Sequence, residues 1–132
     1  MNIIFHKAFY GVYDTDPAAA PGRMEPIIRK LEKHPHYKFI APKPADIEDL
    51  QRAHSPEHIE SIRQSAAIYE MAILAAGGAI KAAELAFLGE PSFGCIRPPG
   101  HHASADSCWG FCFFNNMAVS LLKLHADGKI TS

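Results

Sequence analysis

Short apolar runs alternate with longer stretches of mixed character along this chain of 132 residues. Three of the runs are rich in β-branched or aromatic side chains and are flanked by proline, glycine or polar residues, a pattern that is typical of β-strands. These runs lie at residues 3–5, 37–40 and 92–96. The pattern therefore predicts three strands that are far apart in the sequence.

Two of the stretches between these runs have one apolar face. Over residues 24–33, three aliphatic side chains fall on one side of a helix and charged side chains fall opposite. Ser55 and Pro56 open a second such stretch, with serine placed as the N-cap and proline in the first turn. We expect two amphipathic surface helices here.

Two further helices have a different character. Residues 68–88 are rich in alanine, and Gly77 and Gly78 stand in the middle, where each costs about 1 kcal/mol relative to alanine. This predicts a buried helix that other segments approach closely. The last helix is expected at residues 116–125, with the Asn115-Asn116 pair placed to cap its start.

The order of these elements is strand, helix, strand, helices, strand, helix. Such alternation favours one α/β domain over residues 1–132, built around a mainly parallel sheet that is flanked by helices. In sheets of this kind, functional residues collect in the loops that follow the carboxyl ends of the strands. The loop after the third strand is therefore the first place to look for chemistry, and only residues 14–22 form a long irregular stretch.

Composition narrows the class of protein. With 48% hydrophobic and 20% charged residues, the chain has the composition of a globular protein. Its net charge of -1, with basic and acidic residues interspersed, argues against direct binding to nucleic acid or to an anionic membrane. The longest strongly apolar stretch, residues 71–79, is too short to span a bilayer, and the N-terminus lacks the form of a signal peptide. We expect a cytoplasmic location.

The segment after the third predicted strand contains two adjacent histidines. Residues 97–103 read RPPGHHA, in which two prolines stiffen the backbone and Gly100 allows a turn that most residues resist. His101 and His102 would then be held on a rigid loop, where one imidazole can act as a base and the other as its electrostatic partner near neutral pH. The alternative is that one histidine packs and the other is solvated.

The five other histidines that lie on or beside predicted helices show no partner pattern, which favours surface or packing roles. They are His34, His36, His54, His58 and His125. Neither an HExxH motif nor a phosphate-binding glycine loop is present in the sequence.

Two blocks of sequence together resemble the signature of the histone deacetylase and acetylpolyamine amidohydrolase superfamily. They are RPPGHHA at residues 97–103 and GFCFFNN at residues 110–116, and weaker likenesses at residues 23–31, 53–59 and 75–79 extend over most of the chain. The resemblance implies the N-terminal portion of the catalytic domain, with an arginase/deacetylase-like parallel sheet that is incomplete in this chain. It also implies hydrolysis of an acetyl-amide by a metal-bound water.

Five residues receive roles from this resemblance. His102 would be the general base and later the acid, and His101 would assist it electrostatically. The carbonyl of Gly110 would orient the substrate amide, and Phe111 would form one wall of a narrow tunnel around the acylated side chain. Arg23 matches an arginine that lines an acetate-exit channel, where a guanidinium can bind a carboxylate in a bidentate manner. The alternative for Arg23 is a solvated arginine at a helix start.

The three cysteines and the two adjacent histidines fall within eighteen residues. They lack the short, paired separations of a structural zinc site, and Cys95 lies in a predicted buried strand. Three clustered cysteines also do not form a disulfide framework, so reduced thiols are expected for Cys95, Cys108 and Cys112. Cys112 is placed on the inner pocket or channel.

The resemblance implies a zinc ion, or sometimes iron, held by an Asp-x-His pair and a further aspartate, with a tyrosine that polarises the substrate carbonyl. After Gly110 the only acidic residue is Asp127, and all four tyrosines precede His101. The metal ligands are therefore expected outside this chain. Without a metal the chain alone is expected to be inactive, because two imidazoles cannot polarise an amide as a metal does.

Three accounts of the chain remain open. It is one piece of a longer deacetylase, or a catalytically inactive truncated homologue that acts as a binding or assembly module, or an unrelated domain with structural histidines. The expected partners are an acetylated amine or acetyl-lysine substrate, and either the C-terminal remainder of the same domain or a second copy joined through an open sheet edge.

Overall fold

A three-stranded parallel sheet lies at one end of the molecule in a computed structural model that describes residues 1–131. Its strands are β1 (Asn2–Ile4), β2 (Lys38–Ile40) and β3 (Ser92–Gly94), in the order β2-β1-β3. The predicted parallel α/β architecture is confirmed. β2 and β3 are shorter than the apolar runs that predict them, and β1 is as long as its run but begins one residue earlier. The chain turns away after one further hydrogen bond on each side of β1, from Phe5 N to Ile40 O and from Cys95 N to Ile4 O.

The predicted helices are all present, with small shifts of their ends. They are α1 (Glu25–Glu32), α3 (Pro56–Arg63), α4 (Ala66–Phe87) and α5 (Asn116–Ala126). Ser55 caps α3 by accepting a hydrogen bond from the backbone N–H of His58, as the sequence predicts. The structure adds α2 (Ile47–Gln51) and two 3-10 helices, η1 (Lys7–Tyr10) and η2 (Pro17–Ala19), which are too short to give a periodic pattern in the sequence.

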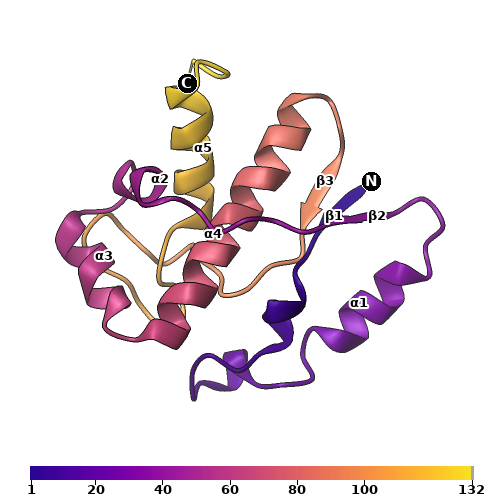
Figure 1. Cartoon of the computed structure of the whole chain (residues 1–132), viewed down its shortest axis with the longest axis horizontal. Helices are drawn as coiled ribbons and strands as arrows, with labels where there is room; N and C mark the ends of the chain where they lie inside the picture. The colour runs from indigo at the N-terminus through magenta and orange to yellow at the C-terminus, as the bar shows by residue number, and fades with distance from the viewer. Residues whose placement is uncertain (132) are drawn as a thin grey trace.

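Helix α4 runs through the middle of the molecule and contacts β1, β3, α3 and α5 (Figure 1). Its two glycines are required for close packing. A side chain at Gly77 would collide with the carbonyl of Lys43, and one at Gly78 would lie 2.7 Å from Cγ2 of Ile96. The prediction of a buried helix that other segments approach closely is therefore confirmed.

By length and composition alone, α4 is long and apolar enough to cross a membrane. Its buried side chains belong instead to one apolar cluster that also includes Ile3 of β1, Ile28 of α1 and Leu50 of α2. Burial inside the protein therefore accounts for part of the apolar composition of this helix, since 44% of its most apolar window is buried.

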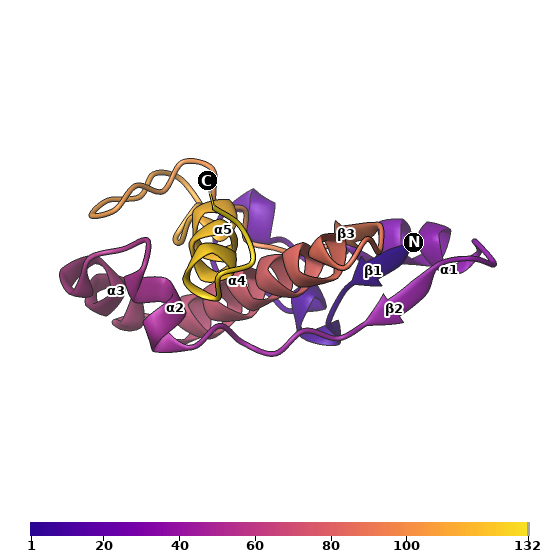
Figure 2. The same cartoon turned by 90° about the horizontal axis from the view of Figure 1, so that it is seen from above.

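The 21 residues between β3 and α5 contain no helix or strand, apart from an isolated bridge between Trp109 and Cys112. Figure 2 shows part of this segment, coloured orange, looping out from the body of the molecule. It contains the block RPPGHHA and all of the block GFCFFNN except Asn116, which begins α5, so the fold brings both blocks together in one loop region.

Candidate active site

The loop that follows β3 begins with a buried arginine. The guanidinium of Arg97 donates hydrogen bonds to the carbonyl oxygens of Phe9 at 2.6 Å, Gly11 at 3.0 Å and Ala20 at 3.0 Å, and it lies 5.6 Å from the centre of the Tyr13 ring. Arg97 therefore joins the N-terminal segment around η1 and η2 to the start of the histidine loop, residues 97–103. The sequence pattern alone indicates no role for Arg97, although a charged side chain that is buried must find polar partners.

Gly100 stands where the histidine loop touches the chain that leads into α5. A side chain here would collide with the carbonyl of Phe114 and would lie 2.6 Å from the backbone nitrogen of Asn116. Gly100 does not have a positive φ, so the predicted reason for a glycine, a turn that other residues resist, is wrong. The glycine is needed because two backbone segments approach each other too closely for a Cβ atom.

Two asparagine side chains join the same segments by hydrogen bonds. The side-chain oxygen of Asn115 accepts from the N–H of Ala118 at 3.0 Å, which confirms the predicted N-cap of α5. Its amide nitrogen donates to the carbonyl of Ala103 at 3.0 Å, and the amide of the buried Asn116 donates to the carbonyl of Pro98 at 3.0 Å. Both ends of the histidine loop are thus held against the start of α5.

The two histidines of this loop face solvent, with their ring centroids 4.2 Å apart. The ring of His102 also packs against the edge of Trp109, with centroids 4.9 Å apart. Trp109 is itself 71% exposed, so these three rings lie together on the surface. Within residues 1–131, the ring nitrogens of His101 and His102 bond to no protein atom, which leaves them available to a substrate.

The remaining predicted site residues follow Trp109. Gly110 is exposed and has φ = +62°, a conformation that favours glycine. Phe111 is partly buried against the apolar core, and Cys112 is 1% exposed. The contact of Trp109 with His102 places this stretch beside the histidines, while the substrate-binding roles of Gly110 and Phe111 and the pocket role of Cys112 stay predictions.

Arg23 is exposed just before α1, and its guanidinium lies 3.4 Å from the carbonyl of Pro17. It therefore contacts η2, the same short helix whose neighbour Ala20 accepts a hydrogen bond from Arg97. The channel role of Arg23 stays a prediction.

No three histidine, cysteine, aspartate or glutamate side chains within residues 1–131 are grouped so that they could hold a metal ion. Cys95 and Cys112 are buried, and burial raises the pKa of the Cys95 thiol and so favours its protonated form. The donor set of the described residues therefore does not fit a zinc or iron site.

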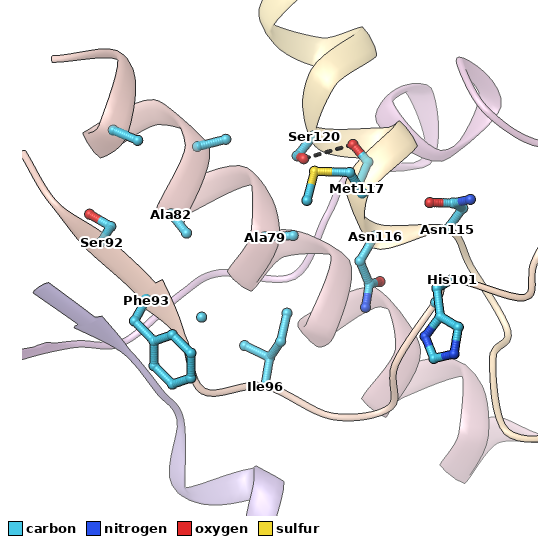
Figure 3. A pocket seen from close by; sticks show the side chains of 14 residues that line it. Ala79, Ala82, Ser92, Phe93, Ile96, His101, Asn115, Asn116, Met117 and Ser120 are labelled. Atoms are coloured by element: carbon cyan, nitrogen blue, oxygen red, sulfur yellow. Dashed lines mark hydrogen bonds between the residues drawn. The ribbon is translucent and has the colours of Figure 1, made fainter. Parts of the chain in front are cut away.

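A cavity of about 720 Å³ lies between α4, β3 and α5 (Figure 3). Small and apolar side chains such as Ala79, Ala82 and Ile96 form most of its lining, and His101 lies at the end away from Ser92. The cavity follows the edge of β3 that pairs with no strand in the described part of the chain. His101 thus belongs both to this cavity and to the exposed surface where the two histidines meet, whereas His102 does not line the cavity.

The parallel sheet and its helices define an α/β protein. The adjacent exposed histidines on the loop after β3 form a candidate site for proton transfer. The family follows from comparison with known proteins. The family model described as "Histone deacetylase domain" matches residues 18–131, and the chain belongs to that family.

Similar proteins agree with this assignment. The chain is 32% identical to a "Probable deacetylase" of Methanothermobacter thermautotrophicus over 136 aligned positions, which cover 90% of this chain and 41% of that protein. It is 40% identical to a "Histone deacetylase-like amidohydrolase" of Pseudomonas aeruginosa over 95 positions, which cover 59% of this chain and 25% of that protein. The chain thus spans well under half the length of these relatives.

The fold has a solved counterpart. The crystal structure of the HDA15 HD domain superposes with a TM-score of 0.82 at 24% identity, covering 97% of this chain and 45% of that chain. The three-stranded parallel sheet with its helices therefore has an incomplete arginase/deacetylase-like fold, as the sequence predicts.

Proposed function

We propose that this chain supplies the histidine pair and part of the substrate-binding surface of a metal-dependent deacetylase that hydrolyses acetyl-lysine or acetylpolyamine amides. The observation that carries the proposal is the exposed pair of His101 and His102, which stands on a doubly anchored loop with no ring nitrogen bonded to residues 1–131. Relatives named as deacetylases contain matching sequence. A cytoplasmic location forms part of the proposal.

In this proposal the two imidazoles divide the work of proton transfer. His102 takes a proton from the attacking water and later returns one to the leaving amine, while His101 stabilises the charge that forms. The carbonyl of Gly110 orients the amide of the substrate, and Phe111 packs against its acylated side chain. Arg23 and Cys112 are the candidates for a channel that releases acetate.

The metal that this family reaction calls for would polarise the amide carbonyl, which an imidazole cannot do to the same extent. Because the described residues do not form a metal site, its ligands would come from outside this chain. They would be contributed by the remainder of the same domain.

The cavity beside β3 favours a second candidate function, that of a catalytically inactive binding or assembly module. Its apolar lining and the unpaired edge of β3 would receive a strand from the rest of the domain or from a second copy of the chain. A module of this kind would need neither His101 nor His102 for its function.

The two candidates are separated by assaying the full-length product of the gene that encodes this chain. Purified protein with zinc added would be incubated with an acetyl-lysine peptide and with an acetylated polyamine, and the released amine would be measured. Hydrolysis that His102→Ala abolishes and that a matched change at the exposed His125 leaves intact supports the deacetylase. A folded product that hydrolyses neither substrate, or one whose His102→Ala variant stays fully active, overturns it.

A further inference from the structure

A second pair of histidines lies behind the histidine loop and is buried. His54 follows α2 and directly precedes Ser55, the N-cap of α3, while His58 lies in the first turn of α3. The two side chains are 4% and 5% exposed, and their ring centroids are 5.1 Å apart. The sequence predicts surface or packing roles for both histidines, and their burial confirms packing.

Each ring bonds to the backbone of the segment that enters α5. The Nε2 atom of His58 lies 2.8 Å from the carbonyl oxygen of Phe113, and the backbone N–H of Asn115 donates to Nε2 of His54 at 2.9 Å. The Phe114 side chain lies against both imidazoles, with centroids 5.3 and 6.0 Å from those of His54 and His58. Two imidazoles thus bond to two successive peptide groups on either side of one buried phenylalanine.

The chemistry of these partners fixes whether the Nε2 atom of each ring carries a proton. A carbonyl can only accept, so Nε2 of His58 must bear a proton, and a backbone N–H can only donate, so Nε2 of His54 must bear none. The proton of a neutral His54 is then on Nδ1, which is buried and without a regular hydrogen bond among the described residues, although the backbone of Ser104 and Ala105 lies close to it. Two neutral rings in these positions must therefore be opposite tautomers.

The bonded segment is also the support of the histidine loop. On its far side, the backbone of Phe114–Asn116 touches Gly100, and the side chain of Asn115 donates to the carbonyl of Ala103. Beside His54, the N–H of Ser55 donates to the carbonyl of Ala105 at 2.7 Å. A short path of direct contacts therefore joins the buried imidazoles to the backbone on both sides of His101 and His102.

We propose that His54 and His58 are positioning residues for His101 and His102, and that they act as a pair of opposite neutral tautomers which bond to Asn115 and Phe113. The positioning role rests on the proposed deacetylase function. Apolar side chains of similar volume would fill the same space but would leave one part-buried N–H and one buried carbonyl without partners. The segment would then be free to shift, and with it the two exposed imidazoles.

The tautomers can be observed directly by NMR on the 132-residue chain labelled with ¹⁵N-histidine at pH 8. Two-bond and three-bond correlations from the ring protons distinguish a protonated from an unprotonated nitrogen. We expect His54 with its proton on Nδ1 and His58 with its proton on Nε2, each assigned from its absence in the corresponding variant. Finding the same tautomer for both rings, or a charged ring, overturns the proposal.

Matched variants test the hydrogen bonds. His54→Gln keeps an acceptor near the N–H of Asn115, and His58→Gln keeps a donor near the carbonyl of Phe113, whereas His54→Leu and His58→Leu remove these groups. Amide hydrogen exchange at Asn115 should accelerate in His54→Leu and recover in His54→Gln, with His125→Leu as the exposed control. Unchanged exchange in a folded His54→Leu chain contradicts the proposal. If the leucine variants do not fold, the NMR measurement of the tautomers and the glutamine variants still test the proposal.

Activity of the full-length gene product separates this inference from the proposed function. A misplaced reacting group costs on the order of 10²-fold in rate, so kcat should fall by about that factor in His54→Leu and be largely restored in His54→Gln. If the unchanged protein hydrolyses its substrate and a folded His54→Leu variant is equally fast, the positioning role fails while the deacetylase stands. If the unchanged protein is inactive, the deacetylase fails and the positioning role with it, whatever the tautomers are.

Discussion

The two histidine pairs of this protein use the same side chain in opposite ways. His54 and His58 are buried four residues apart, and each bonds to a backbone group of another segment. His101 and His102 are adjacent and exposed, and within residues 1–131 their ring nitrogens bond to no protein atom. A buried imidazole that bonds to the backbone through Nε2 holds structure, whereas an exposed imidazole with both nitrogens free can exchange protons with a substrate. Burial and partners, rather than residue type, separate the two roles.

The largest effect that this comparison predicts is on catalysis. His102→Ala should lower kcat/KM of the full-length gene product by about 10²–10⁴-fold, the usual contribution of a positioned general base. The melting temperature should not change, because this side chain is exposed and bonds to no described residue. Steady-state kinetics beside thermal unfolding would measure both. A large loss of stability would place His102 with the buried pair and remove the distinction.

The next largest effect is on the free energy of unfolding, through the contact between the histidine loop and the start of α5. Gly100→Ala should lower the free energy of unfolding by about 1–3 kcal/mol, because the new methyl group meets backbone atoms that have no room to move. Gly94→Ala is a matched control, since its Cβ would lie 3.6 Å from Ile96, an ordinary contact. Urea unfolding of both variants checks this. Equal stabilities would show that the loop is not held where the structure has it.

A smaller effect on stability is expected at Asn115, which caps α5 and bonds to the histidine loop. Asn115→Ala removes the acceptor for the N–H of Ala118 and should cost about 1 kcal/mol of stability. Asn115→Ser keeps a capping oxygen but loses the hydrogen bond to Ala103. If the serine variant matches the original protein in stability but is slower in hydrolysis, the link from Asn115 to the histidine loop serves catalysis rather than folding.

The smallest expected effect is a dependence of the free energy of unfolding on pH, which comes from His54 of the buried pair. Burial and, secondarily, the neighbouring His58 lower the pKa of His54 below its usual value of 6.5. The Phe114 ring also lies against His54. The backbone of Ser104 and Ala105 partly opposes the lowering of this pKa. The unfolded chain therefore binds the proton more readily, so the contribution of His54 to stability is complete above pH 6.5 and is lost as the pH falls below it.

Urea unfolding between pH 8 and pH 5 would show this loss, and the difference from His54→Gln isolates it from the titration of the other histidines. The glutamine variant should lose less stability on acidification than the original protein. Parallel curves would mean that His54 does not couple folding to protonation, and the contrast between the two pairs would then rest on geometry alone.

The sequence predicted the parallel α/β fold and the four longer helices because each has a periodic pattern or a cap that local chemistry explains. Ser55 and Asn115, which cap α3 and α5, are of this kind. It did not predict α2, η1 or η2, which are too short for any pattern to repeat. The sequence also predicted the wrong reason for the glycine at position 100. The glycine is needed because the backbone of Phe114 approaches it closely, and the residues beside Gly100 do not indicate that contact.

By itself, the sequence determined which residues stand on the loop after β3 and to which family the motifs belong, because motif chemistry is local and can be compared directly. Only the tertiary structure decided that Arg97 bonds to the segment around η1 and η2, and that His54 and His58 bond to the chain before α5. The partners in these contacts are backbone groups at least 55 positions away. Because every residue carries the same peptide group, no sequence pattern marks which of them a buried side chain will meet.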